Sequence, residues 1–443
     1  MYSESIERVL KAAGASLGDE IRVSRKAGEA LEGVLMPNSD SNGEGIIIIK
    51  LKNGYNMGVR FDASLSIKKL AGRRETFAFP KVKIDENRKL PRVTLIATGG
   101  TIGSKVDYAT GGVYTLTKPE ELLYLMPELG GIADIRIDNL MSVWSEDITF
   151  NEWQRLATET AKALNEGSRG VVIMHGTDTM HYTSAALSFM LHGLNAPVVL
   201  TGAQRSSDRG SSDAFMNVAC AVRIAAQSDF AGVGICMHAD SSDGFCNLMK
   251  GTKVRKLHTS RRDAFKPVNS RPLARISAES GAIEYVGDNR KTADANGKVK
   301  AVTGFEPKVA LVKFHPNADP DILAYYSKKG YKGIIIEGTG LGHVAVTSGK
   351  EKYPWLDAIR EAVESGMVIG MTSQCLNGRV HHNVYTTGRL LAKAGVIYCE
   401  DMLPEVALVK LGFLLGNYDR KKAAELLDKN LAGEITERTE VDW

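Results

Sequence analysis

The stretch that decides the fold is Val93-Thr-Leu-Ile-Ala-Thr-Gly-Gly-Thr-Ile-Gly103, in which an apolar run leads into a glycine-rich turn. The apolar run predicts a buried strand, Val93–Ala97. Thr101 then follows the carboxyl end of this strand, directly after Gly100. Because α/β proteins gather ligands and reactive groups at that edge of the sheet, the stretch predicts an α/β fold with a functional hydroxyl at Thr101.

A second strand-end motif, His175-Gly-Thr-Asp-Thr179, follows the apolar run Val171–Met174. Two strand-end threonines, Thr101 and Thr177, with Asp178 beside the second, suggest a nucleophile and its activating group, because a hydroxyl attacks only when a neighbour removes its proton. Backbone N–H groups of a glycine turn can stabilise an oxyanion. On the residues alone, a helix-capping role stays open for Thr101 and for Asp178.

Strand and helix patterns alternate from Arg92 onward, which predicts mainly parallel sheets covered by helices. The predicted strands are Val93–Ala97, Gly170–Met174, Val198–Leu200, Val233–Met237, Val309–Phe314, Gly333–Ile336 and Val368–Met371. The predicted helices include Phe150–Leu164, Thr179–Leu191, Asp213–Ala226, Pro354–Ser365 and Pro404–Leu415.

Residues 1 to about 70 have a different pattern, with short β-like runs and tight turns after a helix candidate at Ile6–Ala13. Short strands with tight turns indicate a small β-barrel. The expected organisation is a barrel domain at residues 1–72 and a linker at 73–91, followed by a larger α/β domain at 92–285 and a smaller one at 303–443.

Composition excludes several classes of protein. No apolar stretch of the 443 residues approaches the ~18 residues of a membrane span, and the N-terminus lacks the pattern of a secretory signal. The five cysteines have no Cys-x-x-Cys spacing, so we expect reduced buried thiols and a cytoplasmic protein. The nine histidines lack metal-ligand spacing, and the net charge of +4 is too small to argue for nucleic acid.

Two polar segments could complete a site. Ser104–Thr115 contains Tyr108 and Tyr114 and lacks helical periodicity, which favours a mobile lid whose tyrosines either relay a proton or are merely exposed. Lys250–Lys266 is rich in lysine and arginine; a solvated loop is the ordinary interpretation, RNA contact is a weaker one, and one of its lysines could pair with Asp178.

Three motifs in this order resemble the asparaginase/glutaminase family of amidohydrolases: Ala97–Gly103, His175–Met180 and Gly202-Ala-Gln-Arg205. The resemblance covers about Arg92 to Gly416 and implies two α/β domains, the larger one carrying the nucleophile.

By this resemblance, Thr101 is the acylated nucleophile, and Tyr114 or Tyr108 is its lid partner. Thr177, Asp178 and Lys256 form a second catalytic set. Ser145 and Asp178 would hold the α-carboxylate and α-ammonium of an amino-acid substrate, with Glu146 beside Ser145, and Gly100 would contribute a backbone N–H group.

The additional N-terminal region is similar to that of the D-subunit family of archaeal glutamyl-tRNA(Gln) amidotransferases, as are Arg205–Asp213, His258–Phe265 and Glu400–Val409. This resemblance implies a glutaminase that works with an E subunit, which binds Glu-tRNA(Gln) and uses ATP with Mg. It implies no cofactor or metal on this chain, and we expect a homodimer within the complex. The alternatives are a free-standing cytoplasmic L-asparaginase with an accessory domain, a tRNA-binding module and a nucleotide-binding enzyme.

Overall fold

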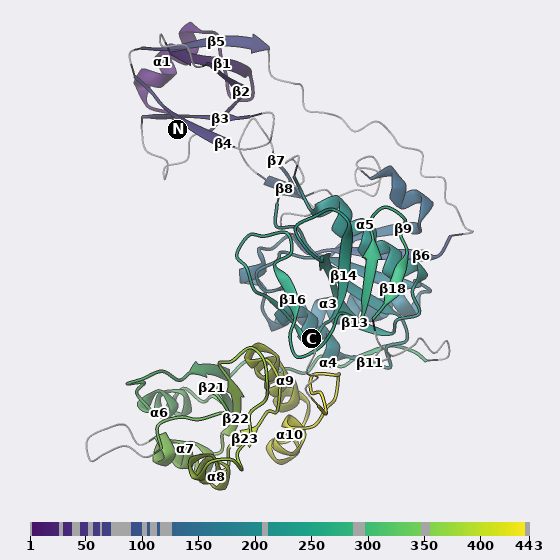
Figure 1. Cartoon of the computed structure of the whole chain (residues 1–443), viewed down its shortest axis with the longest axis vertical. Helices are drawn as coiled ribbons and strands as arrows, with labels where there is room; N and C mark the ends of the chain where they lie inside the picture. The colour runs from purple at the N-terminus through teal and green to yellow at the C-terminus, as the bar shows by residue number, and fades with distance from the viewer. Residues whose placement is uncertain are drawn as a thin grey trace.

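The computed structural model describes residues 2–25, 30–37, 45–51, 56–62, 64–71, 90–99, 104–106, 113–115, 126–205, 211–286, 297–346 and 355–438. These residues form three units, an N-terminal antiparallel sheet, a large mixed sheet and a small parallel sheet (Figure 1). The predicted linker at residues 73–91 lies almost wholly outside the described residues.

The N-terminal unit is a five-stranded antiparallel sheet with one helix, and its strand order is β4-β3-β2-β1-β5. Its elements are α1 (Glu4–Ala12), β1 (Glu20–Arg25), β2 (Ala30–Met36), β3 (Ile46–Lys50), β4 (Asn56–Arg60) and β5 (Leu65–Ala71). Ile6 and Leu10 of α1 pack on alternate strand residues such as Ile21 and Ile47. The prediction of a small β domain is confirmed, but no pairing of β4 with β5 closes the described strands into a barrel.

The large sheet has eight strands in the order β18-β17-β14-β13-β12-β10-β6-β9. The five strands from β13 to β9 are parallel, and the other three are antiparallel. The bounds are β6 (Arg92–Ala97), β9 (Asp134–Asn139), β10 (Gly170–Met174), β12 (Pro197–Thr201), β13 (Gly232–His238), β14 (Phe245–Lys250), β17 (Ala274–Ser277) and β18 (Ile283–Tyr285).

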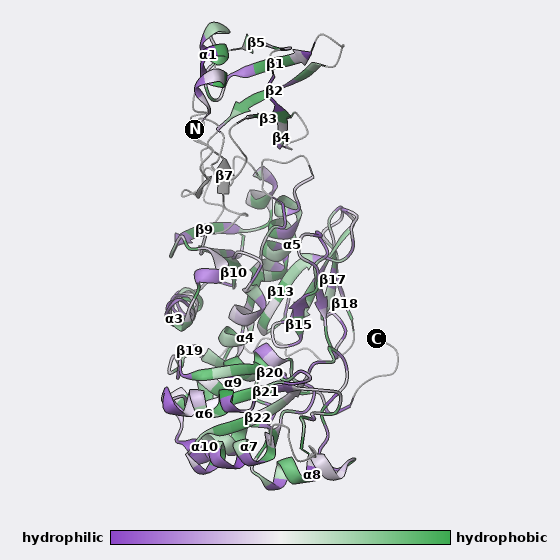
Figure 2. Ribbon diagram, turned by 90° about the vertical axis from the view of Figure 1, so that its left-hand side faces the viewer, coloured by the Kyte–Doolittle hydropathy of each residue, from purple (hydrophilic) through white to green (hydrophobic). Residues whose placement is uncertain are grey.

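Both faces of this sheet are buried, because each strand sends alternate residues into two different cores. Val171 and Ile173 of β10 pack into the core that contains α3 (Phe150–Asn165) and α4 (Met180–Met190). Val172 and Met174 pack into the core that contains α5 (Ala214–Gln227). Apolar segments accordingly run through the middle of the unit in Figure 2.

The smaller C-terminal sheet is parallel throughout, in the order β20-β21-β22-β23. Its elements are β20 (Val309–Lys313), α6 (Asp321–Lys328), β21 (Gly333–Gly338), α7 (Trp355–Glu364), β22 (Val368–Ser373), α8 (Thr386–Lys393), β23 (Ile397–Tyr398), α9 (Pro404–Asn417) and α10 (Arg420–Leu427).

Helix α9 joins the two α/β units. Nearly every residue from Pro404 to Leu414 is buried, as expected of a helix with few polar residues. Phe413 of α9 stacks on Phe189 of α4, with ring centroids 6.1 Å apart. The core on the α4 side of the large sheet therefore extends into the C-terminal unit.

The predicted α/β fold is confirmed, and the predicted elements differ from the observed ones by a few residues at most. The sequence prediction did not include several short or polar elements: β7 (Ser104–Val106), β8 (Val113–Thr115), β9, β11 (Leu191–His192), β14 to β18, β19 (Lys300–Ala301), α6, α8, α10, and the 3-10 helices η3 (Pro127–Gly131) and η4 (Ser145–Asp147). One pair of these, β15 (Val254–Lys256) and β16 (Phe265–Pro267), forms a separate hairpin.

Candidate active site

The parallel strands β6 and β10 end side by side, and the segments that follow them are fastened together. Thr98 donates to the carbonyl of Met174 through both its backbone N–H, at 3.1 Å, and its hydroxyl, at 3.0 Å. Gly99 adopts a φ of +105°, and a Cβ there would lie 2.6 Å from the carbonyl oxygen of Val143. Glycine is therefore required at position 99. The next two residues, Gly100 and the predicted nucleophile Thr101, lie outside the described residues.

At the end of β10 the structure brings together Thr177, Asp178 and Lys256. The Lys256 Nζ donates to the Thr177 hydroxyl oxygen at 2.9 Å and to the Asp178 carboxylate at 2.7 Å. Lys256 comes from β15, so residues 78 positions apart in the sequence meet at one point. Lys256 thus links the threonine hydroxyl to the Asp178 carboxylate, and an amine in hydrogen-bond contact with a hydroxyl can take part in its activation.

The open capping role for Asp178 is wrong. Helix α4 begins at Met180, its N-cap is Thr179, and no side chain caps it. Thr179 instead donates its hydroxyl to the carbonyl of Ser145. The carboxylate of Asp178 is thus free of the helix end and is two-thirds exposed beside Lys256.

Ser145 lies directly against the same turn. It is buried, and its hydroxyl donates to the Glu146 carboxylate at 3.2 Å. A Cβ on Gly176 would lie 2.8 Å from the Cβ of Ser145, so only glycine allows this approach. The structure therefore places Ser145 and Glu146 next to the segment that carries Thr177 and Asp178.

The buried side chain of His175 fixes the turn that carries Thr177 and Asp178. Its Nδ1 donates to the carbonyl of Gly176 at 2.6 Å, so its Nε2 accepts from the Thr183 hydroxyl at 2.9 Å. Trp153 donates to the same hydroxyl at 3.0 Å. Complete burial lowers the pKa of His175 to about 4, and its bond to Gly176 opposes this only weakly. The imidazole is therefore neutral near pH 7 and acts as a fixed strut.

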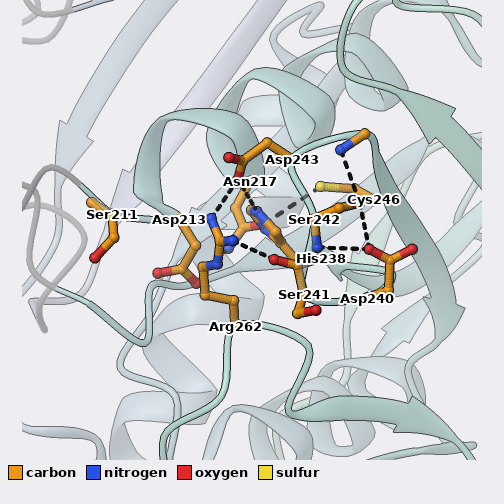
Figure 3. A network of polar contacts seen from close by, with 12 residues as sticks. Ser211, Asp213, Asn217, His238, Asp240, Ser241, Ser242, Asp243, Cys246 and Arg262 are labelled. Carbon is orange, nitrogen blue, oxygen red and sulfur yellow. Dashed lines mark hydrogen bonds and ion pairs between the residues drawn. The ribbon is translucent and has the colours of Figure 1, made fainter.

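A polar network that the sequence analysis missed fastens the end of β12 (Figure 3). The buried Asp213 carboxylate accepts the backbone N–H groups of Gln204 and Arg205 at 3.0 to 3.1 Å. Asn217 donates to Asp213 and to the carbonyl of Gly202, and it accepts from Nδ1 of His238. The spacing of Asp213 and Asn217 by four residues at a helix start was a usable signal. A Cβ on Gly202 would lie 2.8 Å from Cγ2 of Thr177, so this network borders the site.

The two tyrosine candidates are not placed by side chain. Strands β7 and β8 pair antiparallel, with Tyr114 opposite Lys105, and this is all that the structure describes of Tyr114. Tyr108 lies outside the described residues. The choice between them stays a prediction.

The basic segment Lys250–Lys266 is a solvated loop only over residues 257–261, which are exposed. Lys253 is completely buried against Asp401, and Lys256 is largely buried against Asp178. Other ion pairs of the segment join Arg255 to Glu405, Arg261 and Lys266 to Asp263, and Arg262 to Asp243. Since at least six of its seven cations face carboxylates, the segment gives little support to an RNA-binding role.

The cysteines are free thiols, as expected, but Cys375 is exposed whereas the other four are buried. Over the described ranges, no group of three His, Cys, Asp or Glu residues is arranged to hold a metal ion. No helix in the part of the chain that the structure describes is long and apolar enough to cross a membrane.

The fold and the site define an amidohydrolase of the asparaginase class. Residues 92–290 match the family model "Asparaginase, N-terminal", and residues 308–427 match "Glutaminase/Asparaginase C-terminal domain". The solved thermostable L-asparaginase from Thermococcus kodakarensis is similar with a TM-score of 0.69 and 29% identity, over 78% of this chain and 100% of that chain. L-asparaginase I from Vibrio cholerae gives a TM-score of 0.66 at 29% identity, over 78% and 99% of the two chains.

More specific matches extend over the N-terminal unit. Residues 15–70 match the family model "GatD N-terminal domain". The D subunit of glutamyl-tRNA(Gln) amidotransferase from Pyrococcus furiosus is 47% identical over 98% of both chains. The corresponding D subunit from Methanothermobacter thermautotrophicus is 43% identical over 100% of this chain and 99% of the other. The chain therefore belongs to the D-subunit family of glutamyl-tRNA(Gln) amidotransferases.

Proposed function

We propose that this chain is the glutaminase subunit of a tRNA-dependent amidotransferase: it hydrolyses glutamine and supplies ammonia for the conversion of Glu-tRNA(Gln) to Gln-tRNA(Gln). The observation that carries the proposal is the contact of Lys256 with Thr177 and Asp178 at the carboxyl edge of a sheet of the asparaginase class. Similarity to the amidotransferase D subunits over nearly the whole chain favours glutamine as the substrate and a second subunit as the consumer of the ammonia.

The reaction proceeds through an acyl-threonine. The Thr101 hydroxyl attacks the side-chain amide carbon of glutamine, aided by Tyr114 (or Tyr108) or by the Asp178–Lys256 pair acting through Thr177. A C–O bond forms, and the carbonyl oxygen becomes an oxyanion that backbone N–H groups near Gly100 and Thr177 stabilise. Collapse breaks the C–N bond, and the departing nitrogen takes up a proton and leaves as ammonia. Water then cleaves the ester to give glutamate and regenerates Thr101.

The substrate is held by its amino-acid end. Asp178 is exposed enough to receive an ammonium group, and Ser145 and Glu146 lie against the turn that carries it. We assign the α-ammonium to Asp178 and the α-carboxylate to Ser145, with Glu146 beside it and Gly100 donating a backbone N–H. Ion pairs and hydrogen bonds at these ends fix the amide carbon in front of the nucleophile.

Assembly follows from the same assignment. An E subunit would hold Glu-tRNA(Gln) and supply ATP and Mg, so that this chain needs no cofactor or metal of its own, and this chain would form a homodimer in a cytoplasmic complex. We divide the chain into an N-terminal β domain at 1–72, a linker at 73–91, and α/β domains at 92–285 and 303–443.

The test is a substrate comparison. The chain is copurified with candidate partners and assayed with glutamine and with asparagine, with and without charged tRNA. Glutamine hydrolysis that depends on the partner and rises with charged tRNA is expected. Robust turnover of asparagine by the isolated chain would contradict the proposal and favour a free-standing L-asparaginase.

A further inference from the structure

Strand β15 presents its two faces to different units of the molecule. Side chains alternate along extended chain, so Arg255 and Lys253, the residue just before β15, lie on one side and Lys256 on the other. Lys256 reaches Thr177 and Asp178 of the larger α/β unit. Lys253 and Arg255 instead face two carboxylates of the C-terminal unit, Asp401 and Glu405.

The ion pair of Lys253 is fully buried and well hydrogen-bonded. The Nζ of Lys253 lies 2.8 Å from the Asp401 carboxylate and donates to the Asp401 carbonyl at 3.1 Å. The carboxylate also accepts the backbone N–H of Thr436 at 3.0 Å, and Asn269 donates to the Asp401 carbonyl at 3.1 Å. The hairpin of β15 and β16 is thereby fixed to the C-terminal unit at its base.

The Glu405 contact is placed closer to the chemistry. Glu405 lies in the first turn of α9 and is 2% exposed. Its Oε1 lies 3.5 Å from Nε of Arg255 and 3.8 Å from Nε2 of His181. Arg255 is the neighbour of Lys256, and His181 lies in the first turn of α4, three residues after Asp178. The Glu405 carboxylate therefore lies between β15, which carries Lys256, and the start of α4, which follows Asp178.

We infer that Glu405 is a positioning residue for glutamine hydrolysis: it holds β15 and the start of α4 in register so that Lys256 stays within hydrogen-bond distance of Thr177. This inference rests on the proposed function of the Thr177–Lys256 pair. It extends that function by giving the C-terminal unit a part in a site that otherwise belongs to the larger unit.

The surroundings of Glu405 indicate that this carboxyl does not contribute to stability. Oε1 of Glu405 and Nδ1 of His181 are buried and make no hydrogen bond within the described ranges. Burial raises the pKa of Glu405, while Arg255 opposes the shift. A buried carboxyl with such incomplete pairing is costly, and an apolar residue of similar size would serve packing better.

The test compares two buried carboxylates of the C-terminal unit as Gln variants in the full-length protein with its partner. Glu405→Gln keeps the shape and removes the charge that faces Arg255 and His181. We expect kcat for glutamine to fall on the order of tenfold, because reacting groups are misplaced, with KM within about twofold. Glu434→Gln is the matched control, since Glu434 pairs with Lys410 and is equally buried. It should lower the Tm and leave kcat of the folded protein unchanged.

A second variant distinguishes positioning from general damage. In a Lys256→Gln background, Glu405→Gln should cause no further loss of kcat, because Glu405 acts through Lys256. A tenfold loss there as well, or a kcat of Glu405→Gln equal to that of Glu434→Gln, would overturn the inference. If Glu405→Gln does not fold, Arg255→Met breaks the same contact from the other side and should give the same loss. Failure of the wild-type complex to hydrolyse glutamine, or full activity of Lys256→Gln, would instead refute the proposed function.

Discussion

Two lysines three residues apart on the same hairpin have opposite surroundings. Lys253 and its partner Asp401 are both 0% exposed, whereas Lys256 is 10% exposed and its partner Asp178 is 66% exposed. The first pair joins two structural units, and the second lies beside Thr177 with its carboxylate exposed. The contrast teaches that burial separates two roles: the fully buried pair contributes to the fold, and the pair with an exposed carboxylate is the one to which the proposed function assigns the chemistry.

The cost of each pair follows from its burial. Two charges removed from water lose several kcal/mol of hydration each, which only close pairing repays. A pair near the surface keeps most of its hydration, so forming or breaking it changes the free energy of unfolding little. Substitution of either lysine should therefore separate stability from activity, and in opposite directions.

The largest expected effect belongs to Lys256. Lys256→Met removes the amine that contacts Thr177 and should lower kcat for glutamine on the order of a thousandfold, or about 4 kcal/mol of transition-state stabilisation. The thermal midpoint should change little. Steady-state glutamate release and calorimetry on the same preparation measure both quantities. Retention of a tenth of the activity would contradict the assignment of Lys256 to the chemistry.

Lys253→Met should do the reverse. It leaves the Asp401 carboxylate buried without its cation, which costs about 3 kcal/mol of unfolding free energy. Denaturant unfolding followed by circular dichroism measures the loss, while the folded fraction should hydrolyse glutamine at a nearly normal rate. A stable variant with a strongly reduced kcat would assign Lys253 to the chemistry instead.

Low pH should reduce the contribution of His175 to the free energy of unfolding. The pKa of His175 is about 4 in the folded chain because burial disfavours the cation, against about 6.5 when unfolded. Between these values the unfolded state binds a proton that the folded state does not, so this contribution to the unfolding free energy falls as the pH falls. We expect His175 to account for about 2 kcal/mol of lost stability between pH 7 and pH 5.

The check is a pair of unfolding curves at the two pH values for the wild type, His175→Gln and a matched control, His315→Gln, whose imidazole is exposed. The control should lose as much stability as the wild type does, and His175→Gln should lose less. Equal losses in all three proteins would exclude His175 as the source.

The smallest effect on stability is expected for Asp178. Asp178→Ala removes a carboxylate that is 66% exposed, while Lys256 keeps its bond to the Thr177 hydroxyl. The free energy of unfolding should therefore change by only about 1 kcal/mol, although glutamine hydrolysis should be lost. A destabilisation as large as that of Lys253→Met would remove the distinction between the two pairs. Thermal unfolding of both variants in one buffer decides this.

Much of the α/β framework could be predicted because its strands are continuous apolar runs. Gly170–Met174, for example, is predicted and observed with the same bounds. The antiparallel strands β14 to β18 could not, because they are short and mix polar with apolar residues. The prediction of a closed barrel was wrong for the described strands. Turn signals indicate which strands are neighbours, but they do not show whether the edge strands β4 and β5 pair.

The site was predictable only in part. Strand-end position identified Thr177 and Asp178, and the family resemblance supplied Lys256, whose basic neighbours gave no sign of which lysine turns inward. The spacing of Asp213 and Asn217 was a local signal that the prediction did not use. His238 and Glu405 could not be found from the sequence, because their contacts join segments that are distant along the chain. No local pattern of residues encodes such contacts.

The central claim, that Thr101 releases ammonia for use on another chain, is tested most directly by one variant in the complete complex. Formation of Gln-tRNA(Gln) is measured with Thr101→Ala, once with glutamine and once with ammonium as the nitrogen source. The account predicts that the glutamine-driven reaction is abolished and that the ammonium-driven reaction proceeds at the wild-type rate. Persistence of the glutamine-driven reaction, or loss of both reactions in a folded complex, would contradict it.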